Sequence, residues 1–283
     1  MNFHQKPVTY VGEVGLKVMD LEGMVQFYTE TLGFELLSKS DTTAALGIEG
    51  KTLLNLETFE GVEPKTGRYA GLYHFAILLP SRKELGKILV HLHNNGVRLG
   101  SSDHLVSEAL YLSDPEGNGI EIYRDREPEQ WDWDGEEVKM AVDPLDAQGV
   151  VQAAVDSGEV WTGMPADTVM GHIHLHISNM AQTQKFYVDG LGFEVLTSMG
   201  AQAMFLGDQK YHHHIGVNVW NGVGIPALPE KTAGLHYYTL VMADEAKQAE
   251  VAARLQQLGA KVENRGDYME TQDPAGNWIR LVV

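Results

Sequence analysis

Histidines and acidic residues in apolar segments are the side chains of this sequence best suited to chemistry. The chain has 12 histidines and no cysteine, so a bound metal would need ligands from His, Asp or Glu. His74 lies in the apolar run 73–79, where a buried imidazole needs a polar partner or a metal. Glu121 stands between two isoleucines and needs either a cation or an ion pair with Arg124 or Arg126. Divalent-metal or acid–base chemistry is therefore the first class to consider.

The sequence repeats itself, and the repeats indicate which elements carry these residues. The motif FYxxxLGF occurs at residues 27–34 and 186–193, and the motif DPxGNxI occurs at residues 114–120 and 273–279. Around each motif the apolar pattern changes from that of a strand to that of a helix and back to strands. The pattern predicts four copies of one βαβββ unit, and hence an α+β fold.

Aligning the repeats places the chemical residues at matching positions. The first strands of units one to four carry, in order, Glu13, His74, His172 and Tyr237. His172, His174 and His176 share one strand face by alternation. Only His172 is in register with Glu13, so we interpret the other two as structural. His236 is one residue out of register, so its side chain is expected to point away from the cavity that the other first-strand positions face.

Length and composition set the class of protein. The 283 residues are about twice an ordinary domain, and 43% hydrophobic with 21% charged residues is typical of a globular protein. A net charge of -18 without a basic patch disfavours nucleic acid and anionic membranes as partners. The sequence shows no apolar signal segment and no stretch near 18 apolar residues, so we expect no membrane span and a cytoplasmic location.

The predicted units fall into two halves separated by a connector. Units one and two occupy residues 8–125, and units three and four occupy residues 168–283. The connector, residues 126–167, is predicted to contain a hairpin over 130–142 and a short helix over 144–156. A connector of this length in a compact protein is expected to be structural.

These motifs resemble those of the vicinal oxygen chelate superfamily, which includes glyoxalase I and the extradiol ring-cleaving dioxygenases. The segments GLYHFAILLP, at 71–80, and YHHHIGVNVW, at 211–220, are similar to bacillus-type catechol-2,3-dioxygenases. The resemblance covers nearly the whole chain apart from the connector. It implies units paired into two incomplete barrels, with one divalent metal held by residues of first and last strands.

The last-strand positions to which this resemblance points are Glu121 in unit two and Arg280 in unit four. Pairing consecutive units would leave His172 beside Arg280, which cannot bind a cation. Pairing unit two with unit three instead gathers His74, Glu121 and His172, a 2-His-1-carboxylate set. The remaining pair, units one and four, would bring Glu13 and Arg280 into one cavity, where their charges neutralise each other. We therefore expect the second and third units to share the metal site.

The resemblance also implies a histidine and a tyrosine beside the metal, at His214 and Tyr111. His104 lies seven residues before Tyr111, where the family has a histidine nine residues before its tyrosine, so its role stays open. The implied function is an extradiol dioxygenase that uses Fe(II), or Mn(II), to insert O2 beside the diol of a catechol-like substrate. His214 would accept a catechol proton, and Tyr111 would hold a substrate oxygen. A homo-oligomer is left open.

Two other functions stay open from the sequence. Glu13, His74 and Glu121, brought together by consecutive pairing, would suit Zn(II) or Ni(II) in a glyoxalase-like lyase or isomerase. A metal-free small-molecule binding or resistance protein would leave the cavity apolar or plugged.

Overall fold

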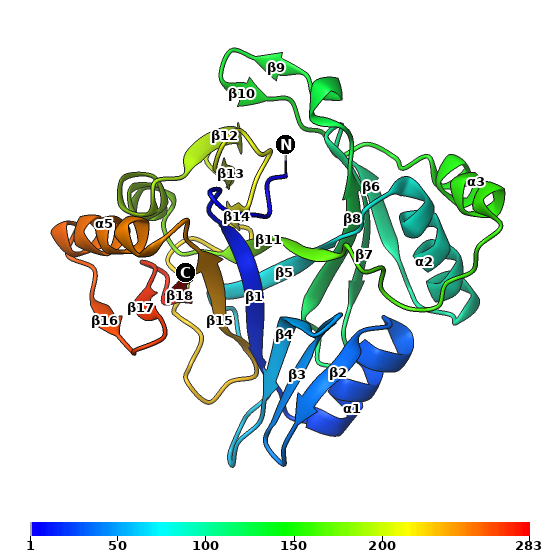
Figure 1. The fold of residues 1–283 in the computed structure, drawn as a ribbon. Coiled ribbons are helices and arrows are strands. Elements are labelled where there is room, and N and C mark those ends of the chain that lie inside the picture. The colour runs from blue at the N-terminus through cyan, green and yellow to red at the C-terminus, as the bar shows by residue number, and fades with distance from the viewer. Residues whose placement is uncertain (1) are drawn as a thin grey trace.

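The computed structural model describes residues 2–283, which form four units of similar topology and a connector (Figure 1). Units one and two contain β1 (Tyr10–Lys17), α1 (Leu21–Gln26) with a π-helical turn (Phe27–Thr31), β2 (Glu35–Lys39), β3 (Thr43–Ile48), β4 (Lys51–Glu57), β5 (Gly71–Leu78), α2 (Arg82–Asn94), β6 (Gly100–Asp103), β7 (Ser107–Ser113) and β8 (Gly119–Asp125). The connector contains a 3-10 turn (Pro128–Gln130), β9 (Trp133–Asp134), β10 (Glu137–Val138) and α3 (Ala147–Ser157). Units three and four contain β11 (Val169–His176), α4 (Met180–Gln184) with a π-helical turn (Lys185–Leu191), β12 (Glu194–Met199), β13 (Ala203–Gly207), β14 (Ile215–Asn218), β15 (Gly234–Val241), α5 (Glu245–Gln257), β16 (Val262–Asn264), β17 (Met269–Gln272) and β18 (Trp278–Val282). The predicted α+β fold of four βαβββ units is confirmed.

Local sequence signals begin and end the helices. The side chain of Ser81 accepts a hydrogen bond from the backbone of Glu84 at the start of α2, and that of Asp244 accepts one from Lys247 at the start of α5. Gly192, with φ of 91°, ends the helix of unit three in the left-handed conformation. These signals fix where each chain segment returns to the sheet.

The strands form two eight-stranded sheets, each built from one unit of either half of the chain. One sheet has the order β16-β17-β18-β15-β1-β4-β3-β2, and we call it the one–four sheet. The other has the order β12-β13-β14-β11-β5-β8-β7-β6, and we call it the two–three sheet. β1 pairs antiparallel with β15, and β5 pairs antiparallel with β11. The pairing of unit two with unit three, favoured by the sequence, is the one present.

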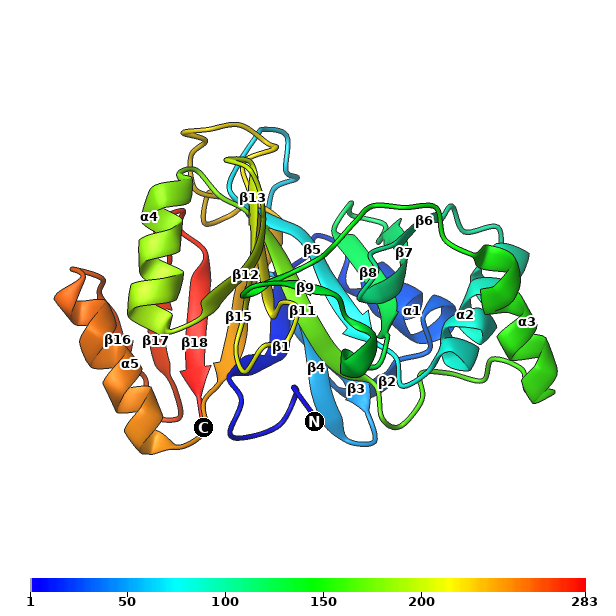
Figure 2. The ribbon, with the colours of Figure 1, turned by 90° about the horizontal axis from the view of Figure 1, so that it is seen from above.

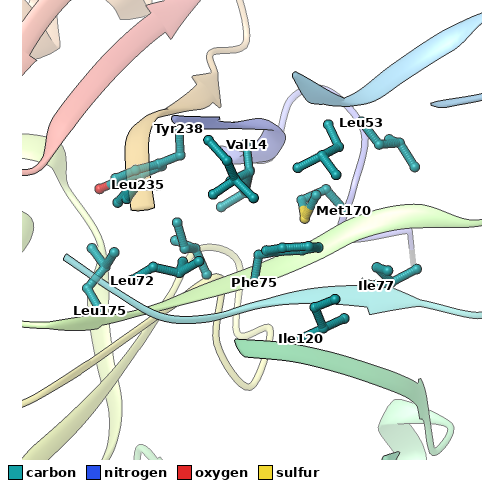
Figure 3. Close-up of a cluster of buried hydrophobic side chains, with 14 of the residues drawn as sticks. Val14, Leu53, Leu72, Phe75, Ile77, Ile120, Met170, Leu175, Leu235 and Tyr238 are labelled. Carbon is teal, nitrogen blue, oxygen red and sulfur yellow. The ribbon is translucent and has the colours of Figure 1, made fainter. Parts of the chain in front are cut away.

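The main core lies where the central strands of the two sheets face each other. Figure 3 shows Val14 and Tyr238 of the one–four sheet opposite Phe75 and Met170 of the two–three sheet, all buried. Side chains alternate along a strand, so the neighbour of Phe75, His74, points to the other face of the sheet. That outer face is where the candidate site lies.

Consecutive units are tied together by the repeated motifs, although they belong to different sheets. The hydroxyl of Tyr28 in unit one donates to Asp114 of unit two over 2.8 Å, and that of Tyr187 in unit three donates to Asp273 of unit four over 3.1 Å. All four residues are buried. The recurrence of both motifs is thus explained by one interaction made twice.

The connector contains the predicted hairpin and helix. β9 and β10 form the hairpin, and α3 packs on α2, where the backbone of Val150 leaves room only for a glycine at position 86 (Figure 2). Within residues 2–283, no helix has the length and apolar character needed to cross a membrane.

Candidate metal centre

The three residues predicted as metal ligands lie together on the outer face of the two–three sheet. His74 is on β5, Glu121 is on the neighbouring β8, and His172 is on β11 at the other side of β5. All three are at least 95% buried. Nε2 of His74 lies 2.9 Å and Nε2 of His172 lies 3.1 Å from the same oxygen, Glu121 Oε2. One ligand atom from each residue lies within 4.8 Å of the others.

These distances suit one divalent ion. Two atoms that bind an ion at about 2.1 Å and at a right angle lie about 3.0 Å apart, close to both observed separations. Nε2 of His74 is buried without a hydrogen-bond partner, although it lies 2.9 Å from Glu121, because the angles are not those of a hydrogen bond. An ion between His74 and Glu121 would give the Nε2 lone pair and the carboxylate oxygen a common partner.

The electrostatics of the cluster also suit a cation. Burial lowers the pKa of His172 to about 4, so this imidazole is neutral near pH 7 and can offer a lone pair. Burial by itself raises the pKa of Glu121, but His172 and His74 outweigh burial and hold that pKa well below its usual range. The cluster therefore presents the neutral imidazole of His172 and one carboxylate, beside the ring of His74.

Tyr111 lies beside this cluster, as the sequence predicts. It is directly opposite Glu121 in the β7–β8 pairing, and its ring centroid is 5.7 Å from that of His74. His104, whose role the sequence left open, lies with Nε2 2.5 Å from the Tyr111 hydroxyl and Nδ1 2.7 Å from the carbonyl oxygen of Ala141. A carbonyl only accepts, so Nδ1 of His104 carries a proton, and in that tautomer Nε2 accepts the hydroxyl proton of Tyr111.

The structure does not bring His214, the predicted acid–base residue, to the cluster. Its Nε2 donates to the carbonyl of Phe3 over 3.0 Å, and its Nδ1 accepts from the backbone of Asp208 over 3.2 Å. Both ring nitrogens are therefore occupied, and neither can take a substrate proton. Of the three rings in the run 212–214, that of His213 contacts the cluster, with its centroid 4.1 Å from that of His172.

The position of His214 differs from the expected one because the histidine run is not a regular strand. Residues 208–214 form an irregular turn, and β14 begins only at Ile215. Counting positions along a regular strand therefore does not show which ring lies beside the cluster. Each of the three imidazole rings in this turn therefore has a different orientation and different partners.

His174 and His176 have the structural role expected of them. Nδ2 of Asn218 donates to Nε2 of His174 over 3.0 Å, and Nδ1 of His176 lies 2.8 Å from Oδ1 of the same Asn218. The exposed ring of Tyr73 lies over both imidazoles, with centroids 5.1 Å away. Tyr73 and His176 line the cleft beside His74.

A cleft of about 800 Å³ opens beside His74 and Tyr111. Lys65 and Arg98 line it, and its lining contains no acidic residue. In a chain with a net charge of -18, such a cleft locally favours an anionic ligand.

The corresponding place on the one–four sheet does not gather metal ligands. Glu13 accepts a hydrogen bond from Asn55, and the guanidinium of Arg280 lies 3.5 Å from the ring centroid of Tyr237. Glu13 and Arg280 line one cavity, as predicted. His236 pairs with Glu57 in a separate cavity. The Glu13–His74–Glu121 set of the glyoxalase-like interpretation is therefore not assembled.

Comparisons with known proteins agree with this fold. Residues 10–122 match the model of the Glyoxalase/Bleomycin resistance protein/Dioxygenase superfamily. Over 280 residues the chain is 41% identical to the Catechol-2,3-dioxygenase of Bacillus subtilis (strain 168), covering 97% of this chain and 98% of that protein.

Solved structures with low sequence identity share the fold. Glyoxalase I from Zea mays aligns with a TM-score of 0.59 at 18% identity, covering 97% of this chain and 92% of that one. The cppA protein from Streptococcus pneumoniae TIGR4 aligns with a TM-score of 0.51 at 14% identity, covering 96% of this chain and 100% of that one. From the full-length relative and the shared fold, this chain belongs to the Glyoxalase/Bleomycin resistance protein/Dioxygenase superfamily.

Proposed function

We propose that this protein is a metal-dependent extradiol dioxygenase that opens a catechol-type ring beside its two hydroxyl groups. The observation that carries the proposal is the buried cluster of His74, Glu121 and His172 in a chain 41% identical to a catechol-2,3-dioxygenase over nearly its full length. The ligand set suits Fe(II), with Mn(II) as the alternative. When bound, the ion supplies a template with open positions for the diol oxygens and O2.

The chain's own residues would handle the substrate protons. Burial lowers the pKa of His213 well below its usual range, so its imidazole is neutral and can accept a catechol proton. Burial and the nearby Glu121 raise the pKa of Tyr111 well above 10.0, so the phenol keeps its proton. Because that proton is donated to His104, the oxygen of Tyr111 is free to accept a hydrogen bond from the second substrate hydroxyl. Tyr111 thus positions the ring rather than exchanging a proton.

The cleft beside the cluster would admit the substrate. Lys65 and Arg98 favour a catechol bearing a negative charge, and Tyr73 offers an aromatic face at the entrance. In the overall reaction one catechol and one O2 give one hydroxymuconic semialdehyde. One ring carbon–carbon bond breaks, and both oxygen atoms enter the product.

The test is oxygen uptake by protein reconstituted with Fe(II) under anaerobic conditions and then mixed with catechol and air-saturated buffer. We expect one O2 consumed per product formed, with activity lost in His74→Ala and His172→Ala. His236→Ala is the matched control and should retain turnover, because His236 lies in the other sheet. Turnover that survives both of the first two changes would overturn the proposal.

A further inference from the structure

A chain of hydrogen bonds leads from the half-buried Asp125, at the end of β8, to the metal cluster. Asp125, the last residue of β8, accepts at Oδ1 from Nε2 of His212 over 2.7 Å. Nδ1 of His212 lies 2.8 Å from Nδ1 of His213, whose ring rests on that of His172. His212 is 0% and His213 is 5% exposed. The chain therefore connects a carboxylate to the imidazole that lies against the proposed metal ligand His172.

The donors and acceptors along this chain follow from the acid at its start. An ionised carboxylate only accepts, so His212 carries a proton on Nε2. In a neutral His212, Nδ1 is then an acceptor, and the facing Nδ1 of His213 donates to it. The lone pair of His213 is left on Nε2. Among residues 2–283, Nδ1 is the ring nitrogen of His213 that makes a hydrogen bond.

The connector covers His212. The ring of Trp131, from the connector, lies 5.2 Å from that of His212 and covers it. Apolar covering of this kind keeps water from the imidazole of His212, whereas Asp125 is half-buried.

A second hydrogen bond fixes the carboxylate itself. The hydroxyl of Tyr211 donates to Oδ2 of Asp125 over 3.0 Å and lies 2.7 Å from the hydroxyl of Tyr123. Both tyrosines are fully buried. Because each oxygen of Asp125 has its own donor, the carboxylate cannot turn away from His212.

We propose that Asp125 and His212 are a positioning pair that sets which nitrogen of His213 carries the proton. The inference rests on the proposed function, since it presents the lone pair of His213 Nε2 to the catechol. Neither Asp125 nor His212 touches the substrate; both act through His213. The orienting acid of a Ser-His-Asp triad works by the same rule, with one imidazole instead of two.

The first test reads the proton positions directly. Zn(II)-loaded protein, which is diamagnetic, is labelled with ¹⁵N-histidine, and two-bond ¹H–¹⁵N correlation spectra separate protonated from unprotonated ring nitrogens. Signals of His213 are assigned from those lost in His213→Gln. The inference predicts a protonated Nδ1 and an unprotonated Nε2 in the parent protein. A protonated Nε2 with an unprotonated Nδ1 would overturn it, whatever the activity.

The second test compares two substitutions of Asp125 in the Fe(II) enzyme. Asp125→Asn keeps the size but can donate to His212 and reverse the chain, so kcat should fall by a factor of about 10² to 10⁴. Its KM for catechol and its metal content should stay near those of the parent. Asp125→Glu changes the size but keeps an acceptor, so it should retain much more activity. A purely structural role for Asp125 predicts the reverse ranking, and that ranking would overturn the inference.

A control separates the positioning pair from general damage to the network. Tyr211→Phe removes the other hydrogen bond to Asp125 and leaves the one to His212, so its loss of kcat should be far smaller than that of Asp125→Asn. Equal losses of kcat in Tyr211→Phe and Asp125→Asn would overturn the proposed role of the positioning pair. If the parent protein turns over no catechol with any metal, the proposed function fails, while the spectra still decide the proton positions.

Discussion

Replacing Glu121 by glutamine separates a metal site from a structural ion pair, because the two accounts predict different effects on the metal-free protein. In the metal account the carboxylate is a buried anion beside a neutral His172. Removing its charge relieves a desolvation cost but also gives up the interactions that hold its pKa below the usual range, so the metal-free variant should melt close to the parent's temperature. If Glu121 instead paired with charged histidines, the variant would lose 3–5 kcal/mol, about what breaking a buried ion pair costs.

The rise in Tm that metal binding should produce can be calculated from the length of the chain. An unfolding entropy of about 2.1 cal/mol/K per residue gives about 0.6 kcal/mol/K for 283 residues. Metal at about 1,000 times its Kd stabilises the parent by about 4.1 kcal/mol, and should raise Tm by about 7 °C. Loss of the anionic ligand at about 3–5 kcal/mol weakens binding by roughly 10² or more. The same metal concentration should then raise Tm of Glu121→Gln by about 2 °C or less.

The assay is thermal unfolding of chelator-treated protein, with and without Mn(II), which is stable in air. His236→Ala serves as the control, because it removes an imidazole from the other sheet and should keep the full metal-dependent rise. The reasoning is refuted if metal-free Glu121→Gln melts about 5 °C or more below the parent and still shows the parent's response to Mn(II).

Three further predictions concern the fold around the site. Gly119→Ala should weaken Mn(II) binding and lower Tm, because its Cβ would lie 2.1 Å from a backbone carbonyl of β5; Gly100→Ala, with its nearest contact at 3.5 Å, is the matched control in a thermal titration. Tyr28→Phe should cost about 1.5–3 kcal/mol in chemical denaturation, since it removes a donor to the buried Asp114; a loss near zero would contradict the role of the repeated motifs. Glu13→Gln should leave the Kd for Mn(II) unchanged in equilibrium dialysis, and a large loss would favour the consecutive pairing of units.

Much of the fold and the ligand set could be predicted because internal repeats constrain both. Alignment of the units placed Glu13 and His172 at equivalent positions, and the pairing of units two and three completed a 2-His-1-carboxylate set. Regular strands supported that reasoning, since alternation fixes which face each side chain occupies. The cluster of His74, Glu121 and His172 formed as expected for this reason.

The histidine ring beside the cluster could not be predicted in the same way. His212, His213 and His214 lie in an irregular turn, where no periodicity tells which ring faces the cluster. The contact of His104 with Tyr111 also escaped the sequence, because it depends on the carbonyl of Ala141 in the connector, which holds the imidazole in place. Such contacts join segments whose relative position is set by tertiary packing alone.

The most direct measurement is the anomalous difference map of crystals of the protein loaded with Mn(II) or Fe(II). The account predicts one strong peak bound at once by Nε2 of His74, Nε2 of His172 and a carboxylate oxygen of Glu121. A peak held by only one of these side chains, or one beside Glu13 on the one–four sheet, would contradict it.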